Sequence, residues 1–196
     1  MFIELTDILR CPAEHDESVL VLLPDGVHGR QVESGHLGCM ECGKVYEVRG
    51  GAAEFAPAPV AVPPSERLTG PAMAAFLGLG GPGGYVAMVG AAAAEWAAFA
   101  AVTEGVHVLA VNAPPGTPGG PGVSLATAAR LPVKGRHLRG VVLGPGFADD
   151  AGWRAEAVRA LLPGGRVVGE GTTPSAPELE VLASADGVWV ARTVAR

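Results

Sequence analysis

Residues 159–168 read Arg-Ala-Leu-Leu-Pro-Gly-Gly-Arg-Val-Val, a stretch in which a helical pattern gives way to a short apolar strand. We predict a helix over 150–162 and a strand over 166–168. The same alternation continues outward along the chain. Further strands are predicted at 85–89, 106–111, 123–128, 141–143 and 188–194, and further helices at 69–79, 91–104 and 177–185. Strands that alternate with helices predict a parallel, doubly wound sheet with right-handed crossovers.

One connection between the predicted strands departs from this alternation. The stretch 113–122 reads Ala-Pro-Pro-Gly-Thr-Pro-Gly-Gly-Pro-Gly, which cannot form a helix. We therefore expect the strands at 106–111 and 123–128 to be joined by a loop.

The 196 residues divide into two modules of different composition. Residues 1–56 contain short predicted strands at 18–23, 31–33, 36–40 and 44–48, whereas residues 69–196 contain the alternating pattern. Between them, residues 57–68 form a proline-rich linker, which we expect to be extended and semi-rigid. A module of roughly 55 residues with such short strands has little core of its own, so it needs a metal or a partner surface.

The formal net charge of −6 is unevenly distributed. Residues 1–58 contain ten acidic and four basic side chains, and residues 59–196 contain ten of each. Without a basic stripe, direct contact with nucleic acid is disfavoured. The first residues lack the features of a signal peptide, and the uncharged stretch 68–94 is interrupted by Pro71 and Pro82, so we expect no membrane span and a cytoplasmic protein.

Three cysteines suggest a metal site in the first module. Cys39-Met40-Glu41-Cys42 is a C-x-x-C turn followed by glycine, and Cys11 could supply a third thiolate. Glu14 and His15 compete as the fourth ligand, and His15 is favoured because imidazole is the better zinc partner. We therefore expect that a metal, if present, is zinc bound by Cys11, His15, Cys39 and Cys42. The alternative is that all three cysteines are reduced core residues.

The first module resembles a known family. Asp7-Ile8-Leu9-Arg10-Cys11-Pro12, followed by Leu37-Gly38-Cys39-x-x-Cys42-Gly43-Lys44-Val45-Tyr46, is similar to the small zinc-ribbon proteins that activate tRNA, rRNA and release-factor methyltransferases. The resemblance covers residues 1–56. It departs from the family at Glu14, which stands where a second cysteine is usual, and at Ala52-Ala53, which stands where Ile-Pro is usual.

The second module resembles class I S-adenosylmethionine-dependent methyltransferases, most sharply at residues 159–168. The resemblance implies an α/β fold in which a small β-rich zinc-ribbon-like module is followed by a Rossmann-like, mostly parallel methyltransferase-type sheet. The family's cofactor residues are largely missing. Met88 and Asn112 replace carboxylates, and only Gly90 remains of the glycine loop, because Ala92 and Ala94 take the other glycine positions. We therefore expect no S-adenosylmethionine in this degenerate cleft.

These observations favour a non-catalytic methyltransferase-like protein, a pseudoenzyme that acts through protein–protein contacts as a scaffold, as a homodimer or as the activator of a partner methyltransferase. The alternative is a divergent S-adenosylmethionine-dependent methyltransferase. A third class is a redox or metal-sensing module that uses the three cysteines. No catalytic residue is predicted, because the serines lack a nucleophile elbow and His107 and His137 lie outside any ligand spacing.

Overall fold

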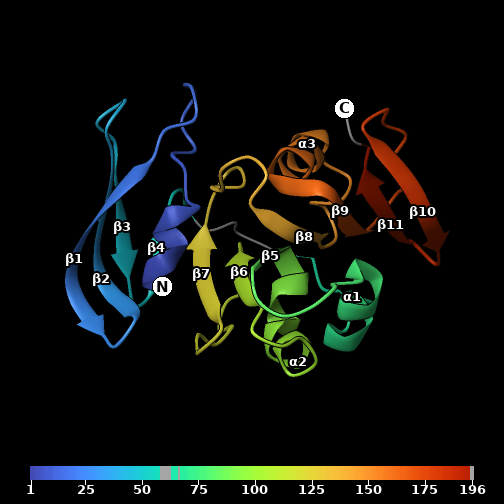
Figure 1. Cartoon of the computed structure of the whole chain (residues 1–196), viewed down its shortest axis with the longest axis horizontal. Coiled ribbons are helices and arrows are strands. Elements are labelled where there is room, and N and C mark those ends of the chain that lie inside the picture. Colours follow the sequence, from blue (N-terminus) through green and yellow to red (C-terminus); the bar gives the residue numbers. More distant parts are fainter. Residues whose placement is uncertain (58–62, 66, 195–196) are drawn as a thin grey trace.

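A computed structural model describes residues 1–57, 63–65 and 67–194, and its strands form one continuous sheet (Figure 1). The predicted linker at 57–68 falls partly on 58–62 and 66, which lie outside the described residues. The strands are β1 (Leu20–His28), β2 (Gln31–Cys39), β3 (Val45–Arg49), β4 (Ala52–Glu54), β5 (Tyr85–Val89), β6 (His107–Val111), β7 (Val123–Thr127), β8 (Leu138–Leu143), β9 (Leu161–Glu170), β10 (Leu179–Ala185) and β11 (Val188–Thr193). The helices are α1 (Gly70–Leu77), α2 (Trp96–Ala100) and α3 (Ala151–Ala160), with 3₁₀ turns η1 (Ile3–Asp7) and η2 (Gly90–Glu95).

The C-terminal part of the chain, residues 67–194, forms a doubly wound sheet. Its five parallel strands lie in the order β7-β6-β5-β8-β9, so the chain reverses its direction of winding between β5 and β8. The antiparallel pair β11 and β10 completes that side of the sheet. This arrangement confirms the predicted fold class, a mixed α/β fold with a Rossmann-like, methyltransferase-type sheet.

The central parallel strands β5 and β6 are buried on both faces, because helical segments and the N-terminal part cover the sheet on either side. Val86 and Met88 of β5 belong to the cluster that contains α1 and α2, whereas Ala87 and Val89 belong to the cluster that contains α3. Figure 1 shows α1 and α2 together below the strands and α3 above them. Among the described residues, no helix is long and apolar enough to cross a membrane.

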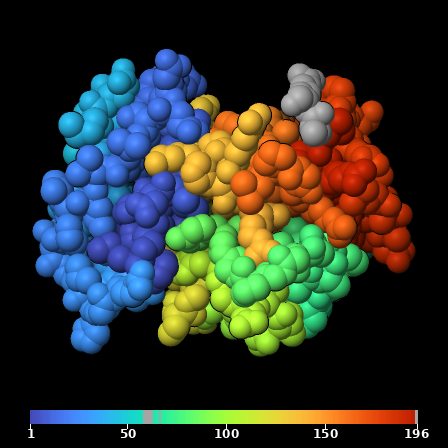
Figure 2. All heavy atoms as spheres, in the orientation of Figure 1, coloured from blue at the N-terminus to red at the C-terminus, as the bar shows by residue number. Residues whose placement is uncertain are grey.

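The N-terminal part, residues 1–57, continues the same sheet. Strands β1 to β4 pair antiparallel in chain order, and β4 then pairs in parallel with β7, aligning Ala53 with Ala126. Leu5 and Leu9 share one buried cluster with Leu109 of β6. The loop predicted between β6 and β7 is confirmed, and the η1 segment helps to cover the face that a crossover helix would otherwise cover. Figure 2 shows the two parts packed side by side.

The helix predicted at 177–185 is wrong, because these residues form β10, the outer strand of a hairpin with β11. The reason is the turn that follows. Asp186 and Gly187 both have positive φ, 52° and 74°, which suits the two-residue hairpin turn that Asp-Gly sequences favour. Formation of the hairpin therefore overrides the helical propensity of residues 177–185.

Two further predicted boundaries are wrong. The helix expected over 91–104 is split into η2 and the short α2, and the Thr103 hydroxyl donates to the carbonyl of Phe99 just beyond its end. The strand expected over 18–23 instead runs from Leu20 to His28, because Pro24-Asp25-Gly26 continues β1 with a bulge in its pairing with β2. In the second case, the pairing with β2 decides the outcome.

Candidate functional site

Four potential metal ligands converge at one end of the N-terminal sheet. Cys39 ends β2, Cys42 lies in the turn toward β3, and Cys11 and His15 lie between η1 and β1. Their ligand atoms all lie within 4.8 Å of one another. Cys11 and Cys39 are buried and Cys42 is exposed. The structure thus brings together all four residues that the sequence analysis grouped. Glu14, which the structure also describes, does not belong to this cluster.

The spacing of these atoms fits a tetrahedral zinc ion. With Zn–S bonds of about 2.3 Å, the sulfur atoms of a tetrahedral site lie about 3.8 Å apart, and a sulfur and a nitrogen ligand lie slightly closer. The Cys11 and Cys42 Sγ atoms are 3.8 Å apart, and the Cys39 Sγ atom is 3.5 Å from Nε2 of His15. The donor set, three thiolates and one imidazole, could therefore hold zinc.

Groups around the cluster orient the ligands and influence their protonation. Burial raises the pKa of Cys39, but hydrogen bonds from the backbone N–H groups of Cys42 and Glu41 outweigh it, and the net effect lowers this pKa to about 6. Burial raises the pKa of Cys11. His15 Nδ1 lies 2.5 Å from the carbonyl oxygen of Asp16, so a proton on Nδ1 leaves Nε2 free for a metal.

Tyr46 is a residue that the sequence analysis did not assign to the site. Its hydroxyl lies 3.1 Å from the Cys11 Sγ atom, and its ring packs against Phe55 with centroids 5.1 Å apart. Burial, followed by the contact with Cys11, raises the pKa of Tyr46, so the phenol stays protonated and can donate to the sulfur. The alternation of β3 places Tyr46 on the inner face of the sheet and could have indicated this contact.

The second candidate site is the carboxyl edge of the parallel strands, where a doubly wound sheet would bind a ligand. Gly90 follows β5 with a φ of 70° and begins η2. Gly144, which follows β8, lies directly against this turn. A Cβ atom on Gly144 would lie 2.9 Å from the Val89 carbonyl oxygen and 3.2 Å from the Ala92 nitrogen, and Ala92 has no exposed surface. Gly144 therefore covers the backbone N–H of Ala92, which a ligand at this edge would approach.

Met88 and Asn112 are both directed into protein contacts. Met88 is completely buried in the core beneath α1 and α2. Asn112, at a φ of 53°, donates from Nδ2 to the carbonyl of Ala128 at 2.8 Å and accepts from the N–H of Ala128 at 3.0 Å. Neither side chain offers a free polar group at the carboxyl edge.

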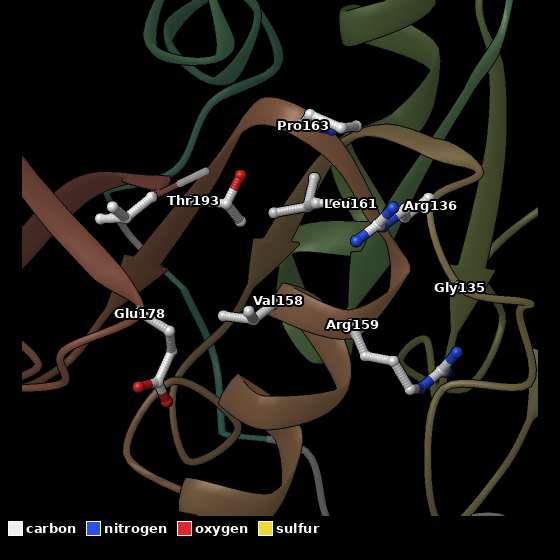
Figure 3. Close-up of a pocket in the computed structure, with 9 residues that line it drawn as sticks. Gly135, Arg136, Val158, Arg159, Leu161, Pro163, Glu178 and Thr193 are labelled. Carbon is white, nitrogen blue, oxygen red and sulfur yellow. The ribbon is translucent and has the colours of Figure 1, made fainter. Parts of the chain in front are cut away.

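A cavity of about 650 Å³ opens at the opposite edge, beside the amino ends of β8 and β9. Figure 3 shows the guanidinium of Arg136 beside Leu161, whereas the side chain of Arg159 extends away. Arg159 instead binds Glu156 at 2.8 Å and Glu17 at 3.4 Å. The residues that line the cavity are Gly135, Arg136, Val158, Arg159, Leu161, Pro163, Glu178, Thr193 and Val194. This is the edge away from the usual ligand position of the fold.

His107 contacts both parts of the chain. It begins β6, which β3, β4 and β7 separate from β2 and its metal ligand Cys39. Its ring stacks on Phe2 with centroids 4.8 Å apart, and Nε2 lies 2.9 Å from the Ser124 hydroxyl, which also accepts from the N–H of Phe2. Burial, with the positive N-terminal ammonium as a smaller cause, lowers the pKa of His107 to about 4. The imidazole is therefore neutral at pH 7 and has a structural role.

Comparisons with known proteins give fold-level similarity. No family model matches the chain, and no curated protein matches it. A chain from the Haloferax volcanii complex of the Trm112 methyltransferase activator aligns with a TM-score of 0.43 and 18% identity, covering 52% of this chain and 50% of that one. The antibiotic-resistance methyltransferase Kmr aligns with a TM-score of 0.45 and 13% identity over 65% of this chain and 94% of that one.

A third solved structure, an S-adenosylmethionine-dependent methyltransferase from Mesorhizobium loti, aligns with a TM-score of 0.41 and 18% identity, covering 50% of this chain and 51% of that one. The chain thus spans about half the length of the first and third of these proteins. The strand order, not these scores, identifies the fold.

Proposed function

We propose that this chain is a non-catalytic methyltransferase-like protein that acts through protein–protein contacts, with a zinc-ribbon-like module at residues 1–56 fused to the methyltransferase-like domain at 69–196. The observation that carries the proposal is the closed carboxyl edge of the parallel strands. Gly144 lies against the Gly90 turn, and the Asn112 amide is paired with Ala128. An S-adenosylmethionine molecule would have to displace backbone contacts there.

The chemistry of the same edge supports this reading. S-adenosylmethionine carries a positive sulfonium and an ammonium group, and its ribose presents a diol. Met88 and Asn112 are uncharged, so neither supplies the charge-assisted hydrogen bonds of about 1.5–3 kcal/mol that a carboxylate would contribute. The loss of two such bonds would raise a micromolar dissociation constant to roughly the millimolar range or beyond.

Isothermal titration of the zinc-loaded protein with S-adenosylmethionine tests the proposal. We expect no binding below about 1 mM ligand. A thermal unfolding scan with and without ligand is a second readout, since a ligand that binds only the folded chain raises its melting temperature. Micromolar binding would overturn the proposal and favour a divergent methyltransferase.

For the N-terminal part, we propose a structural zinc ion bound by Cys11, His15, Cys39 and Cys42. Four protein ligands complete a tetrahedral shell, which is typical of structural rather than catalytic zinc. Two of the ligands precede β1 and two lie at the β2–β3 turn, so the ion would tie the start of the chain to the sheet. Elemental analysis of the purified protein should find about one zinc per chain.

The partner surface lies outside the contact that the chain makes with itself. The β4 strand already pairs with β7, and Phe2, Leu5 and Leu9 already pack against the C-terminal part. A protein partner must therefore bind another face. The outer side of β1, β2 and β3 is such a face.

A further inference from the structure

The outer face of β1, β2 and β3 is not covered by any other described element. Side chains alternate along these strands, so Leu20, Leu37 and Val48 point to the shared core and their neighbours point outward. Figure 1 shows β1 to β3 at one end of the molecule, with η1 and β7 on the side toward the core. The opposite side of the three strands faces solvent.

Apolar side chains gather on this outer face. Val21 and Leu23 alternate with inward residues along β1, and Val45 lies on β3. We define the outer apolar patch by its five members, Val19, Val21, Leu23, Met40 and Val45, whose exposed fractions run from 42% to 74%. A cluster of this kind, in contrast to single exposed apolar residues, marks an interaction surface.

The patch has a hollow at its centre. Gly38 of β2 is aligned with Val21 on one side and with Val45 on the other. A Cβ atom on Gly38 would touch only the Val21 carbonyl oxygen, at 4.0 Å, so the space above the glycine is open. Leu23 follows Val21 by two residues and Met40 follows Gly38 by two, so both exposed side chains lie on the same face as Gly38, with Leu23 aligned with His36. Their side chains are of a size that could enter the same hollow on a facing surface.

Charged side chains of both signs border the patch. Glu41 and Lys44 are exposed, they adjoin Met40 and Val45 in the chain, and among the described residues neither makes an ion pair. At the other end of the face, Arg49 pairs with Glu47 and Glu54. A two-fold interface uses the same surface of both copies, and a surface with an unpaired acid and an unpaired base beside one apolar patch can pair with itself in this way.

We propose that the outer apolar patch is the surface through which two copies of this chain pair face to face, with Glu41 of each copy opposite Lys44 of the other. This rests on the proposed function, because it names the partner of a protein that acts by contact. The two sheets would pack at about 10 Å, with apolar side chains of each copy filling the Gly38 hollow of the other. Such an interface is isologous and closed, so it yields dimers and no larger assembly.

Sedimentation velocity of the zinc-loaded full chain tests the pairing. Between about 1 and 100 µM protein, we expect the mass to rise from the 19.8 kDa of one chain toward twice that value and to stop there. A monomer throughout this range would overturn the proposal, as would growth beyond a dimer.

A matched pair of substitutions locates the interface. Val45→Asp places a charge in the patch, and Val102→Asp makes the same change at a valine of similar exposure, 56% against 63%, in the C-terminal part. We expect Val45→Asp to raise the dimer dissociation constant at least about tenfold and Val102→Asp to leave it unchanged. Equal effects would contradict the assignment of the patch.

A charge exchange tests the facing arrangement without changing the apolar residues. Glu41→Lys and Lys44→Glu should each weaken the dimer, because each brings like charges together, and the double variant should restore it. Zinc content, measured for every variant, confirms that the neighbouring cluster is intact. Failure of the double variant to recover would overturn the predicted pairing of Glu41 with Lys44.

The outcomes of these experiments are distinguishable from those of the S-adenosylmethionine titration. A monomer that binds no S-adenosylmethionine would overturn the dimer and leave the proposed non-catalytic function in place. A dimer that binds the ligand at micromolar concentration would support the interface and overturn the non-catalytic function.

Discussion

The side-chain amide of Asn112 forms two hydrogen bonds with the backbone of Ala128, one as donor and one as acceptor. Asn112 follows β6 and Ala128 follows β7, so the pair holds together the carboxyl ends of two neighbouring parallel strands. Asn112 is 4% exposed, and its φ of 53° lies in the left-handed region that asparagine tolerates. This residue therefore stabilises the closed edge of the sheet.

The pair predicts a strong effect of Asn112→Asp. Aspartate tolerates the same backbone conformation, but a carboxylate cannot donate to the Ala128 carbonyl and would place two oxygens against each other in a buried position. We expect the free energy of unfolding in urea to fall by about 2–4 kcal/mol. A loss below about 0.5 kcal/mol would show that the amide donor is unimportant.

The zinc assignment predicts different results for two neighbouring substitutions. His15→Gln removes the proposed fourth ligand, so zinc content should fall and the melting temperature should drop, whereas Glu14→Gln should leave both unchanged. Cys39→Ser should lose zinc as well. Elemental analysis and a thermal scan measure both quantities, and a Glu14→Gln protein without zinc would reverse the choice between the two residues.

His107 predicts a loss of stability in acid. Its folded pKa of about 4 lies below the ordinary value of 6.5, so between these pH values the unfolded chain binds more protons. Stability from the neutral imidazole is thus complete above pH 6.5 and is lost as the pH falls toward 4. Between pH 7 and pH 5, we expect His107 to account for a loss of about 2 kcal/mol.

A His107→Phe variant isolates this contribution. The aromatic ring can still stack on Phe2, but it does not titrate. The groups that face His107 are the Tyr85 ring, the Ser124 hydroxyl and the N-terminal ammonium. The difference in unfolding free energy between pH 7 and pH 5 should be smaller in the variant than in the parent chain. Equal differences would mean that other groups dominate the acid response.

Gly169 predicts a steric effect in the core. A Cβ atom at this position of β9 would lie 2.2 Å from the Trp189 ring, which is fully buried. Gly169→Ala should therefore destabilise the chain by about 3 kcal/mol or more. Gly80→Ala is the matched control, since no heavy atom lies within 4 Å of its Cβ position, and it should change stability by less than about 0.5 kcal/mol.

The contacts between the two parts predict the behaviour of a cleaved chain. We expect a protease to cut the proline-rich stretch 57–68. The fragments should nevertheless elute together, because three kinds of contact join them. Strand β4 pairs with β7, and the backbone N–H of Arg10 donates to the Pro132 carbonyl. Leu5 and Leu9 also share the core of the C-terminal part. Separation of the fragments in size-exclusion chromatography under native conditions would show that these contacts do not hold the parts together.

The sequence predicted the parallel strands best, because their apolar runs are continuous and bounded by glycine. Tyr85–Val89 coincides with β5, and the loop that replaces a helix before β7 followed from its prolines. The sequence analysis does not predict the hairpin of β10 and β11, because residues 177–185 also suit a helix, although Asp186-Gly187 is a hairpin signal.

The ligand types of the candidate site could be predicted from the sequence, but the contacts around it could not. The C-x-x-C turn identified Cys39 and Cys42, and the chemistry of metal ligands selected Cys11 and His15. The contact between Tyr46 and Cys11 joins residues far apart in the chain, and so does the approach of Gly144 to Ala92. Neither leaves a periodic pattern in one sequence, since both depend on how the strands are ordered in the sheet.

The parallel pairing of β4 with β7 also has a consequence for the order of folding. The four proposed zinc ligands lie within residues 11–42, so they can be loaded as soon as that segment leaves the ribosome. The strand that receives β4 is synthesised about 70 residues later, which takes roughly 4–14 seconds at ordinary rates of translation. During that interval β4 is an open edge, so the nascent chain would pass through a metal-bound but undocked state before the sheet is completed.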